Sequence, residues 1–215
     1  MKNAGDKNKF TREEEIVNAI SHGIGALLSI AALIILIIVA STTGTTRHVI
    51  GFTGFGLALL LLYSFSTLQH GLRADKAKYI FEILDHSAIY VLIAATYTVF
   101  TLTILKSPLG WSLFGIEWGL AIGGIFFKCL FLGKFEHLST MVYLLMGWLI
   151  IIAILPLRQS LPDKSFILLV VGGMFYTVGV YFYSKATFKF HHAIWHLLVL
   201  AGSISHFFAV LYILI

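Results

Sequence analysis

The chain has 215 residues, of which 59% are hydrophobic and only 12% are charged. Its mean hydropathy is +0.92. A soluble domain of this length could not bury so much apolar surface, so the composition indicates an integral membrane protein. The formal net charge of +5 suits contact with anionic lipid headgroups, and nucleic-acid binding is not needed to explain it.

Seven apolar segments follow one another, each close to the roughly 20 residues that a membrane-spanning helix needs. No alternation at period two is present, so a β-barrel is not expected. The sequence predicts an all-α integral membrane protein, a seven-transmembrane-helix bundle over residues 15–215 after a short tail of residues 1–14. The predicted spans are Val17–Ala40, Val49–His70, Glu82–Leu105, Ser112–Leu132, Ser139–Leu157, Ser165–Ser184 and His192–Ile215.

The basic residues predict how the bundle is oriented. Eleven of the fifteen lysines and arginines fall on the side of the N-terminus: Lys2, Lys7, Lys9, Arg12, Arg73, Lys76, Lys78, Lys128, Lys134, Lys185 and Lys189. The other side has Arg47, Lys106, Arg158 and Lys164. Because cytoplasmic loops are enriched in positive charge, we expect a cytoplasmic N-terminus and an external C-terminus in the cell membrane.

Five polar residues that are far apart in sequence are predicted to lie at one depth. Ser66 and His70 end the second span, Asp85 starts the third, and His192 and His196 start the seventh. Successive spans run in opposite directions, so all of these positions fall near the cytoplasmic face. Polar groups at membrane depth are costly and indicate a functional site. His192 and His196 are four residues apart and can therefore face one ion, whereas His191 points elsewhere.

Three neutral imidazoles leave the fourth tetrahedral position on zinc open, as in catalytic zinc sites. We therefore expect His70, His192 and His196 to bind Zn²⁺. Asp85 could bind or deprotonate a water molecule or complete the coordination, and Ser66 could stabilise an oxyanion or orient His70. Each residue also has a simpler explanation. An acid in the first turn of a helix suits the helix dipole, and a lone interfacial histidine is often only hydrogen-bonded.

Further polar and small residues have structural interpretations. Glu15, Asn18 and His22 lie on one face of the first span, where we expect capping and interhelical hydrogen bonds beside the site. His206 lies deeper in the seventh span and is expected to make an interhelical hydrogen bond. The fourth span carries a glycine ridge that consists of Gly115, Gly119 and Gly123. We expect this ridge to pack closely within the bundle, in preference to forming a dimer contact.

Four motifs, in this order and spacing, resemble those of the hemolysin III family, the bacterial branch of the progestin and adipoQ receptor superfamily. They are EEEIVNAISHGIGA, STLQH, ILDHSAIY and HHAIWHLLVL. The resemblance implies seven helices with a cytoplasmic N-terminus. It also implies zinc held by His70, His192 and His196, with Asp85 holding or activating a water molecule and Ser66 as the serine of the S-x3-H motif.

Three functions are compatible with these features. The first is zinc-dependent hydrolysis of a lipid amide or ester at the membrane face, which would make membrane lipid the substrate and which resembles the activity of distantly related alkaline ceramidases. The second is a cytolytic, channel-forming protein, as the name of the bacterial branch implies. A pore favours a polar stripe through the bilayer, whereas the polar residues here gather at one end. The third is a sensor, receptor or scaffold in membrane-lipid homeostasis, with structural zinc.

Overall fold

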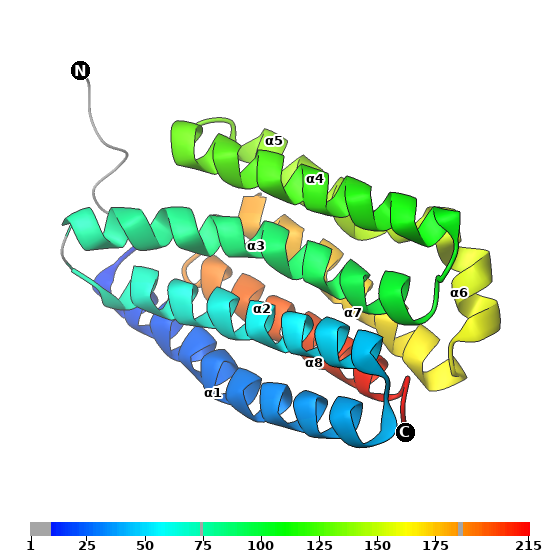
Figure 1. The fold of residues 1–215 in the computed structure, drawn as a ribbon. Coiled ribbons are helices and arrows are strands. Elements are labelled where there is room, and N and C mark those ends of the chain that lie inside the picture. The colour runs from blue at the N-terminus through cyan, green and yellow to red at the C-terminus, as the bar shows by residue number, and fades with distance from the viewer. Residues whose placement is uncertain (1–9, 74, 185–186) are drawn as a thin grey trace.

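The structure is a computed structural model that describes residues 10–73, 75–184 and 187–215. Every regular element in these ranges is a helix, as Figure 1 shows. The elements are α1 (Arg12–Thr43), α2 (Thr46–Gly71), α3 (Asp75–Thr103), α4 (Pro108–Phe131), α5 (Glu136–Trp148), the 3₁₀ helix η1 (Leu149–Ala153), α6 (Ile154–Ser160), α7 (Asp163–Ser184) and α8 (His191–Leu211). Most of the predicted tail, and four of the basic residues counted above, lie outside the described residues: Lys2, Lys7, Lys9 and Lys185.

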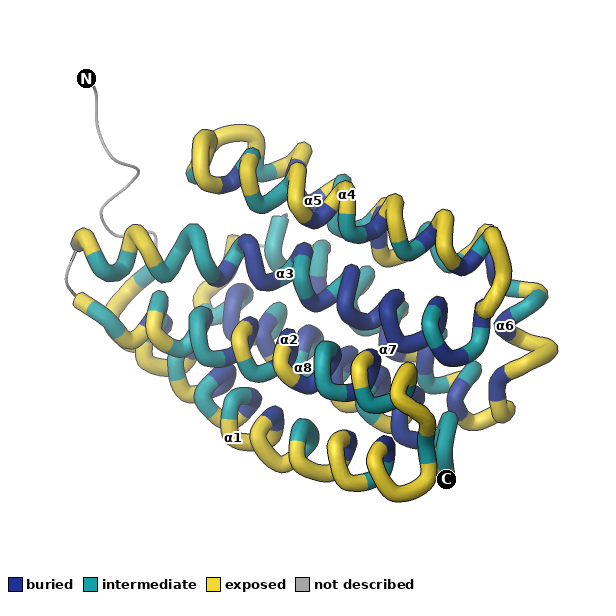
Figure 2. The backbone as a smooth tube through the Cα atoms, in the orientation of Figure 1, coloured by how far each residue is buried: buried dark blue, intermediate teal, exposed yellow. Residues whose placement is uncertain are grey.

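Seven helices are long and apolar enough to cross a membrane when α5, η1 and α6 are taken together as the span Glu136–Ser160. The predicted all-α, seven-span bundle is therefore confirmed. Figure 2 shows that much of the outer side of α1 and α4 is exposed. On α1 this surface includes Ile20, Leu27 and Ile34. Large apolar side chains exposed along whole helices suit contact with hydrocarbon, which places the protein in a membrane.

All seven spans in the described residues begin earlier than the predicted apolar segments, and the difference is largest for α1 and α3. α1 starts at Arg12 because Thr11 is its N-cap, and the Glu14 carboxylate accepts hydrogen bonds of 2.9 Å from both the backbone N–H and the hydroxyl of Thr11. This is a capping box. α3 starts at Asp75 instead of at the predicted Glu82. Hydropathy detects only the part of a helix that enters hydrocarbon, so these polar first turns were not included in the predicted spans.

Close approach between α1 and α2 depends on two glycines. A Cβ atom added at Gly25 of α1 would lie 2.5 Å from the ring of Tyr63 on α2. A Cβ atom added at Gly56 of α2 would lie 2.8 Å from the side chain of Leu33 on α1. Small residues at these positions let the two helix backbones pack closely, as in membrane helix pairs generally. This contact determines which side of α1 faces the three histidines described below.

The fifth span was predicted as one continuous helix, but it is interrupted by η1. The interruption leaves carbonyl groups of α5 in need of donors, and the Tyr97 hydroxyl of α3 donates to the carbonyl oxygens of Met146 (2.7 Å) and Gly147 (3.3 Å). Irregular backbone at membrane depth is tolerated where other protein groups satisfy it or where it lines a cavity. Both conditions hold here, since Gly147 and Ile150 line the central cavity described below.

The glycine ridge of α4 does not pack within the bundle, so this prediction was wrong. A Cβ atom added at Gly115, Gly119 or Gly123 would meet no atom within 4 Å. α4 turns a different face towards α3. There a Cβ atom at Gly124 would lie only 2.3 Å from the Tyr90 ring, and Ala121 is fully buried. Because the two faces are adjacent on the helix, the glycine spacing alone did not identify the buried one.

Candidate metal centre

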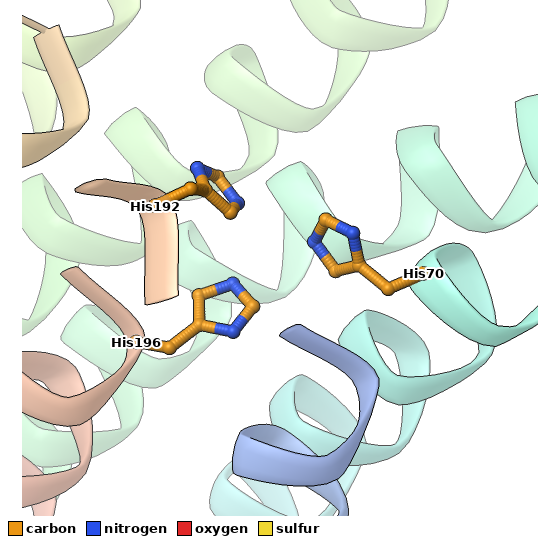
Figure 3. Close-up of side chains that lie close together, drawn as sticks. All are labelled: His70, His192 and His196. Atoms are coloured by element: carbon orange, nitrogen blue, oxygen red, sulfur yellow. The ribbon is translucent and has the colours of Figure 1, made fainter. Parts of the chain in front are cut away.

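Three histidines meet where the C-terminal end of α2 approaches the N-terminal end of α8 (Figure 3). His70, His192 and His196 are buried, and each offers a ring nitrogen within 4.8 Å of those of the other two. Their ring centroids are 4.6 to 5.1 Å apart. His192 and His196 are one turn apart on α8, so both rings can face His70. The three predicted ligands are therefore together and can hold a metal ion.

The hydrogen bonds of His196 define its tautomer. Its Nδ1 lies 3.0 Å from Ser21 Oγ and 3.2 Å from the Asn18 carbonyl oxygen. The Ser21 hydroxyl donates its own hydrogen to that same carbonyl, at 2.8 Å, so both neighbours of Nδ1 act as acceptors. Nδ1 therefore carries the proton and Nε2 carries the lone pair. His196 Nε2 is buried and has no hydrogen-bond partner among the described residues, which suits a metal ligand.

A carboxylate fixes the tautomer of His70 in the same way. His70 Nδ1 lies 2.5 Å from Glu15 Oε2 of α1, so the imidazole donates from Nδ1 and would bind a metal through Nε2. The other oxygen of Glu15 accepts a hydrogen bond from Lys78 Nζ on the early part of α3. A carboxylate behind a ligating histidine orients the ring and increases its basicity. Glu15, His70 and Lys78 thus link three different helices, α1, α2 and α3.

The N-terminus of α8 is held against α1 by the same carboxylates that begin α1. The backbone N–H of Phe190 donates to Glu14 Oε1 at 3.0 Å, and Lys189 Nζ donates to Glu13 Oε2 at 2.6 Å. The Glu13 carboxylate raises the pKa of Lys189. Phe190 is the N-cap of α8 and has a left-handed backbone (φ 65°), which is uncommon for a residue with a side chain. The Glu14 contact thus fixes the turn that positions His192.

Asp85 and Ser66 lie beside the histidines. Ser66 is fully buried one turn before His70 on α2, and Asp85 of α3 is 8% exposed. The two side chains are neighbours, and Asp85 also lines the central cavity. The structure therefore brings all five residues of the predicted constellation to one end of the bundle.

An apolar cavity of about 160 Å³ extends from this end into the bundle. Asp85 and His22 line it near the histidines, and Phe100 lines it farther along α3. Phe100 is fifteen residues after Asp85 on a continuous helix, a distance of about 22 Å at 1.5 Å per residue. Most of the wall is formed by hydrophobic side chains of α3, α5, α7 and α8. The cavity thus has a carboxyl group and an imidazole at the end near the histidines and runs through much of the hydrocarbon depth.

The expected hydrogen bonds from Glu15, Asn18 and His22 are only partly present. Glu15 makes the interhelical bond described above. Asn18 contributes its backbone carbonyl, while both polar atoms of its side chain are buried and unpartnered among the described residues. His22 stacks on His196, with ring centroids 3.5 Å apart and ring planes 12° apart, and neither of its ring nitrogens has a hydrogen-bond partner in the described part of the chain. Its contact with the site is ring packing.

Two further histidines lie as the sequence predicts. His191 Nδ1 lies 2.8 Å from the carbonyl oxygen of Phe182 on α7, and this residue is not one of the three that face one another. His206 Nε2 lies 3.0 Å from the carbonyl oxygen of Leu169 on α7, so the expected interhelical hydrogen bond of His206 is confirmed.

The fold and the buried residues at one end of it define a multi-pass membrane protein with a three-histidine cluster. The family described as "Haemolysin-III related" matches residues 10–207, and the chain belongs to this family. It is 56% identical over 200 residues to Hemolysin-3 of Bacillus cereus, covering 93% of this chain and 91% of the relative. It is 56% identical over 203 residues to a Hemolysin-3 homolog of Bacillus subtilis (strain 168), with 94% and 95% coverage. The monocyte to macrophage differentiation factor of Homo sapiens is 28% identical over 162 residues, with 73% and 67% coverage.

The carboxylate of Glu15 is expected to strengthen metal binding. Glu15→Gln keeps an oxygen that can accept from His70 Nδ1 but removes the charge, so zinc affinity should fall about 10- to 100-fold, as for other partners of ligating histidines. Competition with a chromogenic chelator measures this change. Glu13→Gln is the matched control, since Glu13 is on the same turn but bonds the exposed Lys189. Equal zinc affinity in the two variants would contradict the role of Glu15.

Proposed function

We propose that this protein is a zinc-dependent hydrolase that cleaves amide or ester bonds of membrane lipids at the cytoplasmic face. The observation that carries the proposal is the apolar cavity, which begins at Asp85 beside the three histidines and continues for about 22 Å between the helices. Such a space suits the hydrocarbon chain of a lipid whose polar linkage is held next to the histidines.

The donor set fits zinc. Three imidazoles are a common set of protein ligands in catalytic zinc sites, where the remaining position is open. The lone pairs of His70 and His196 are on Nε2, and the buried Nε2 of His196 lacks another partner in the described chain. A bound zinc ion would lower the pKa of a water molecule and polarise a carbonyl group.

The protein residues supply the proton transfers. Asp85 takes the proton of the attacking water as the water oxygen forms a bond to the carbonyl carbon. It then gives this proton to the leaving nitrogen or oxygen as the C–N or C–O bond breaks, so the products are a fatty acid and an amine or alcohol. The hydroxyl of Ser66, beside Asp85, orients the carboxyl group or donates to the developing oxyanion.

A cytolytic channel is the second candidate, because the relatives from both Bacillus species are named Hemolysin-3 or its homolog. An ion pathway favours polar groups along its length. The walls of the cavity are mostly hydrophobic beyond the site, and this favours a lipid chain over hydrated ions. We therefore rank hydrolysis above pore formation.

The test measures lipid turnover by detergent-purified protein incubated with extracted membrane lipids, using mass spectrometry of the products. Zinc-loaded protein should release fatty acid, and chelation should stop the release. Dye-loaded liposomes supply the comparison. Dye release that is unaffected by chelation, without any lipid turnover, would remove the hydrolase and support the channel.

A further inference from the structure

A second polar group interrupts the apolar wall of the cavity, away from the metal centre. Tyr176 of α7 and His206 of α8 both line the cavity, and their rings meet edge to face with centroids 5.2 Å apart. His206 is 8% exposed and lies ten residues after His196 on the same helix, about 15 Å along its axis. Polar groups at this depth are costly, so a pair of them beside a cavity indicates a function.

Two glycines hold these rings in place. A Cβ atom added at Gly172 of α7 would lie 2.1 Å from the imidazole of His206. A Cβ atom added at Gly202 of α8 would lie 2.9 Å from the ring of Tyr176. Each ring therefore lies over a glycine of the opposite helix. This reciprocal packing fixes both side chains at the cavity wall with little freedom to turn away.

The hydrogen bond of His206 leaves an acceptor on its ring. Its Nε2 lies 3.0 Å from the carbonyl oxygen of Leu169, which can only accept, so Nε2 carries the proton and Nδ1 carries the lone pair. Nδ1 makes no hydrogen bond among the described residues. Since the residue is more than nine-tenths buried and lines the cavity, we place this acceptor at the cavity wall.

The hydroxyl of Tyr176, on the ring that packs against His206, can either donate or accept in its contact with Ser203. The Tyr63 hydroxyl donates to Ser203 Oγ at 2.7 Å, and Ser203 Oγ lies 2.9 Å from the Tyr176 hydroxyl. If Ser203 donates its hydroxyl hydrogen to Tyr176, the hydroxyl hydrogen of Tyr176, which lines the cavity, is not used within this chain of hydroxyls. If Tyr176 donates to Ser203 instead, the unused hydroxyl hydrogen is that of Ser203, which is buried. The first arrangement places the hydrogen where a ligand can accept it.

We infer that Tyr176 and His206 form a second binding point for a hydroxyl group carried in the middle of the hydrocarbon chain of a lipid ligand. A hydroxyl both donates and accepts, and so matches the Nδ1 acceptor and the Tyr176 donor together. The inference rests on the proposed function for the class of ligand, but it concerns binding and does not require cleavage. It makes this pair a determinant of which chains the cavity prefers.

Three free fatty acids, which contain no amide or ester to be cleaved, test the inference. Octadecanoate, 12-hydroxyoctadecanoate and 2-hydroxyoctadecanoate compete for detergent-purified protein, with bound lipid measured by native mass spectrometry. The 12-hydroxy acid should bind about five- to tenfold more tightly than the other two, the effect of one satisfied hydrogen bond. The 2-hydroxy acid is the control, because its hydroxyl lies beside the carboxylate and far from His206.

Two variants separate recognition from folding. His206→Phe keeps a ring over Gly172 but removes the acceptor at Nδ1, and Tyr176→Phe keeps the ring over Gly202 but removes the hydroxyl. Both should bind octadecanoate as the wild type does and lose the preference for the 12-hydroxy acid. A preference that persists in both variants would overturn the inference.

The outcomes distinguish this inference from the proposed function. Equal binding of the three acids by the wild type would contradict the inference but would still show that the protein binds a lipid chain. Binding of none of the acids would contradict both lipid binding in the cavity and the inference. Preferential binding of the 12-hydroxy acid, without turnover of any extracted lipid, would retain the inference and remove the hydrolase.

Discussion

Replacing His196 with alanine is expected to abolish stoichiometric zinc binding. The change removes the buried Nε2 that has no other hydrogen-bond partner in the described chain, together with the ring that Ser21 and Asn18 orient. His192→Ala should have the same result, because two remaining imidazoles hold zinc poorly. The measurement is metal content per chain by mass spectrometry of detergent-purified protein, after size-exclusion chromatography has confirmed that each variant is folded.

His191→Ala is the matched control for these two variants. His191 is adjacent to His192 in sequence, but its Nδ1 contacts the Phe182 carbonyl of α7, so its removal should leave about one zinc per chain. If the His191 variant lost zinc and the His192 variant kept it, the helical phase of α8 that we describe would be wrong. Loss of zinc in all three variants would instead indicate that α8 as a whole had moved.

The three-histidine cluster could be predicted from the sequence for a simple geometric reason. Membrane-spanning helices restrict each residue to a known depth, and the spacing of His192 and His196 defines a face of the seventh span. Depth and face together bring His70 close to them, even though the chain separates these residues by more than 120 positions. The number of spans followed from hydropathy in the same way.

The contacts of the first helix could not be predicted so closely. Whether Glu14 or Glu15 faces α2 depends on how α1 is rotated and shifted against its neighbours. Glu15 contacts His70, while Glu14 both caps α1 and holds the backbone of Phe190. The T-x-x-E pattern from Thr11 to Glu14 is a recognisable capping signal, but it does not reveal the second contact with α8.

Two other features depend on packing that the pattern of hydrophobic residues does not show. The interruption of the fifth span is stabilised by the hydroxyl of Tyr97 from another helix, so the local sequence around Met146 looks like an ordinary apolar helix. The exposed glycine ridge of α4, at Gly115, Gly119 and Gly123, has the spacing of a packed face. Spacing shows that close approach is possible, and only the arrangement of neighbouring helices shows whether it occurs.

Asp85→Asn is expected to reduce lipid hydrolysis by about 10²- to 10⁴-fold, the usual contribution of a general base. The variant keeps the size of the side chain and a hydrogen-bonding oxygen beside Ser66, but it cannot take a proton from water. Zinc content should stay near one per chain, because His70, His192 and His196 can hold the ion without the carboxylate. Lipid turnover by mass spectrometry and metal content are measured on the same preparation.

Comparison of Asp85→Asn with His196→Ala separates loss of proton transfer from loss of zinc. Both variants should lose turnover, but only the histidine variant should also lose zinc, which separates the proton-transfer role of Asp85 from metal retention. A channel needs no general base, so dye release from liposomes should be unchanged in Asp85→Asn if the protein forms pores. Asp85→Asn protein that loses zinc together with turnover would show that the carboxylate is a metal ligand. Full turnover in this variant would remove Asp85 from the chemistry and leave proton transfer to another group at the cavity end.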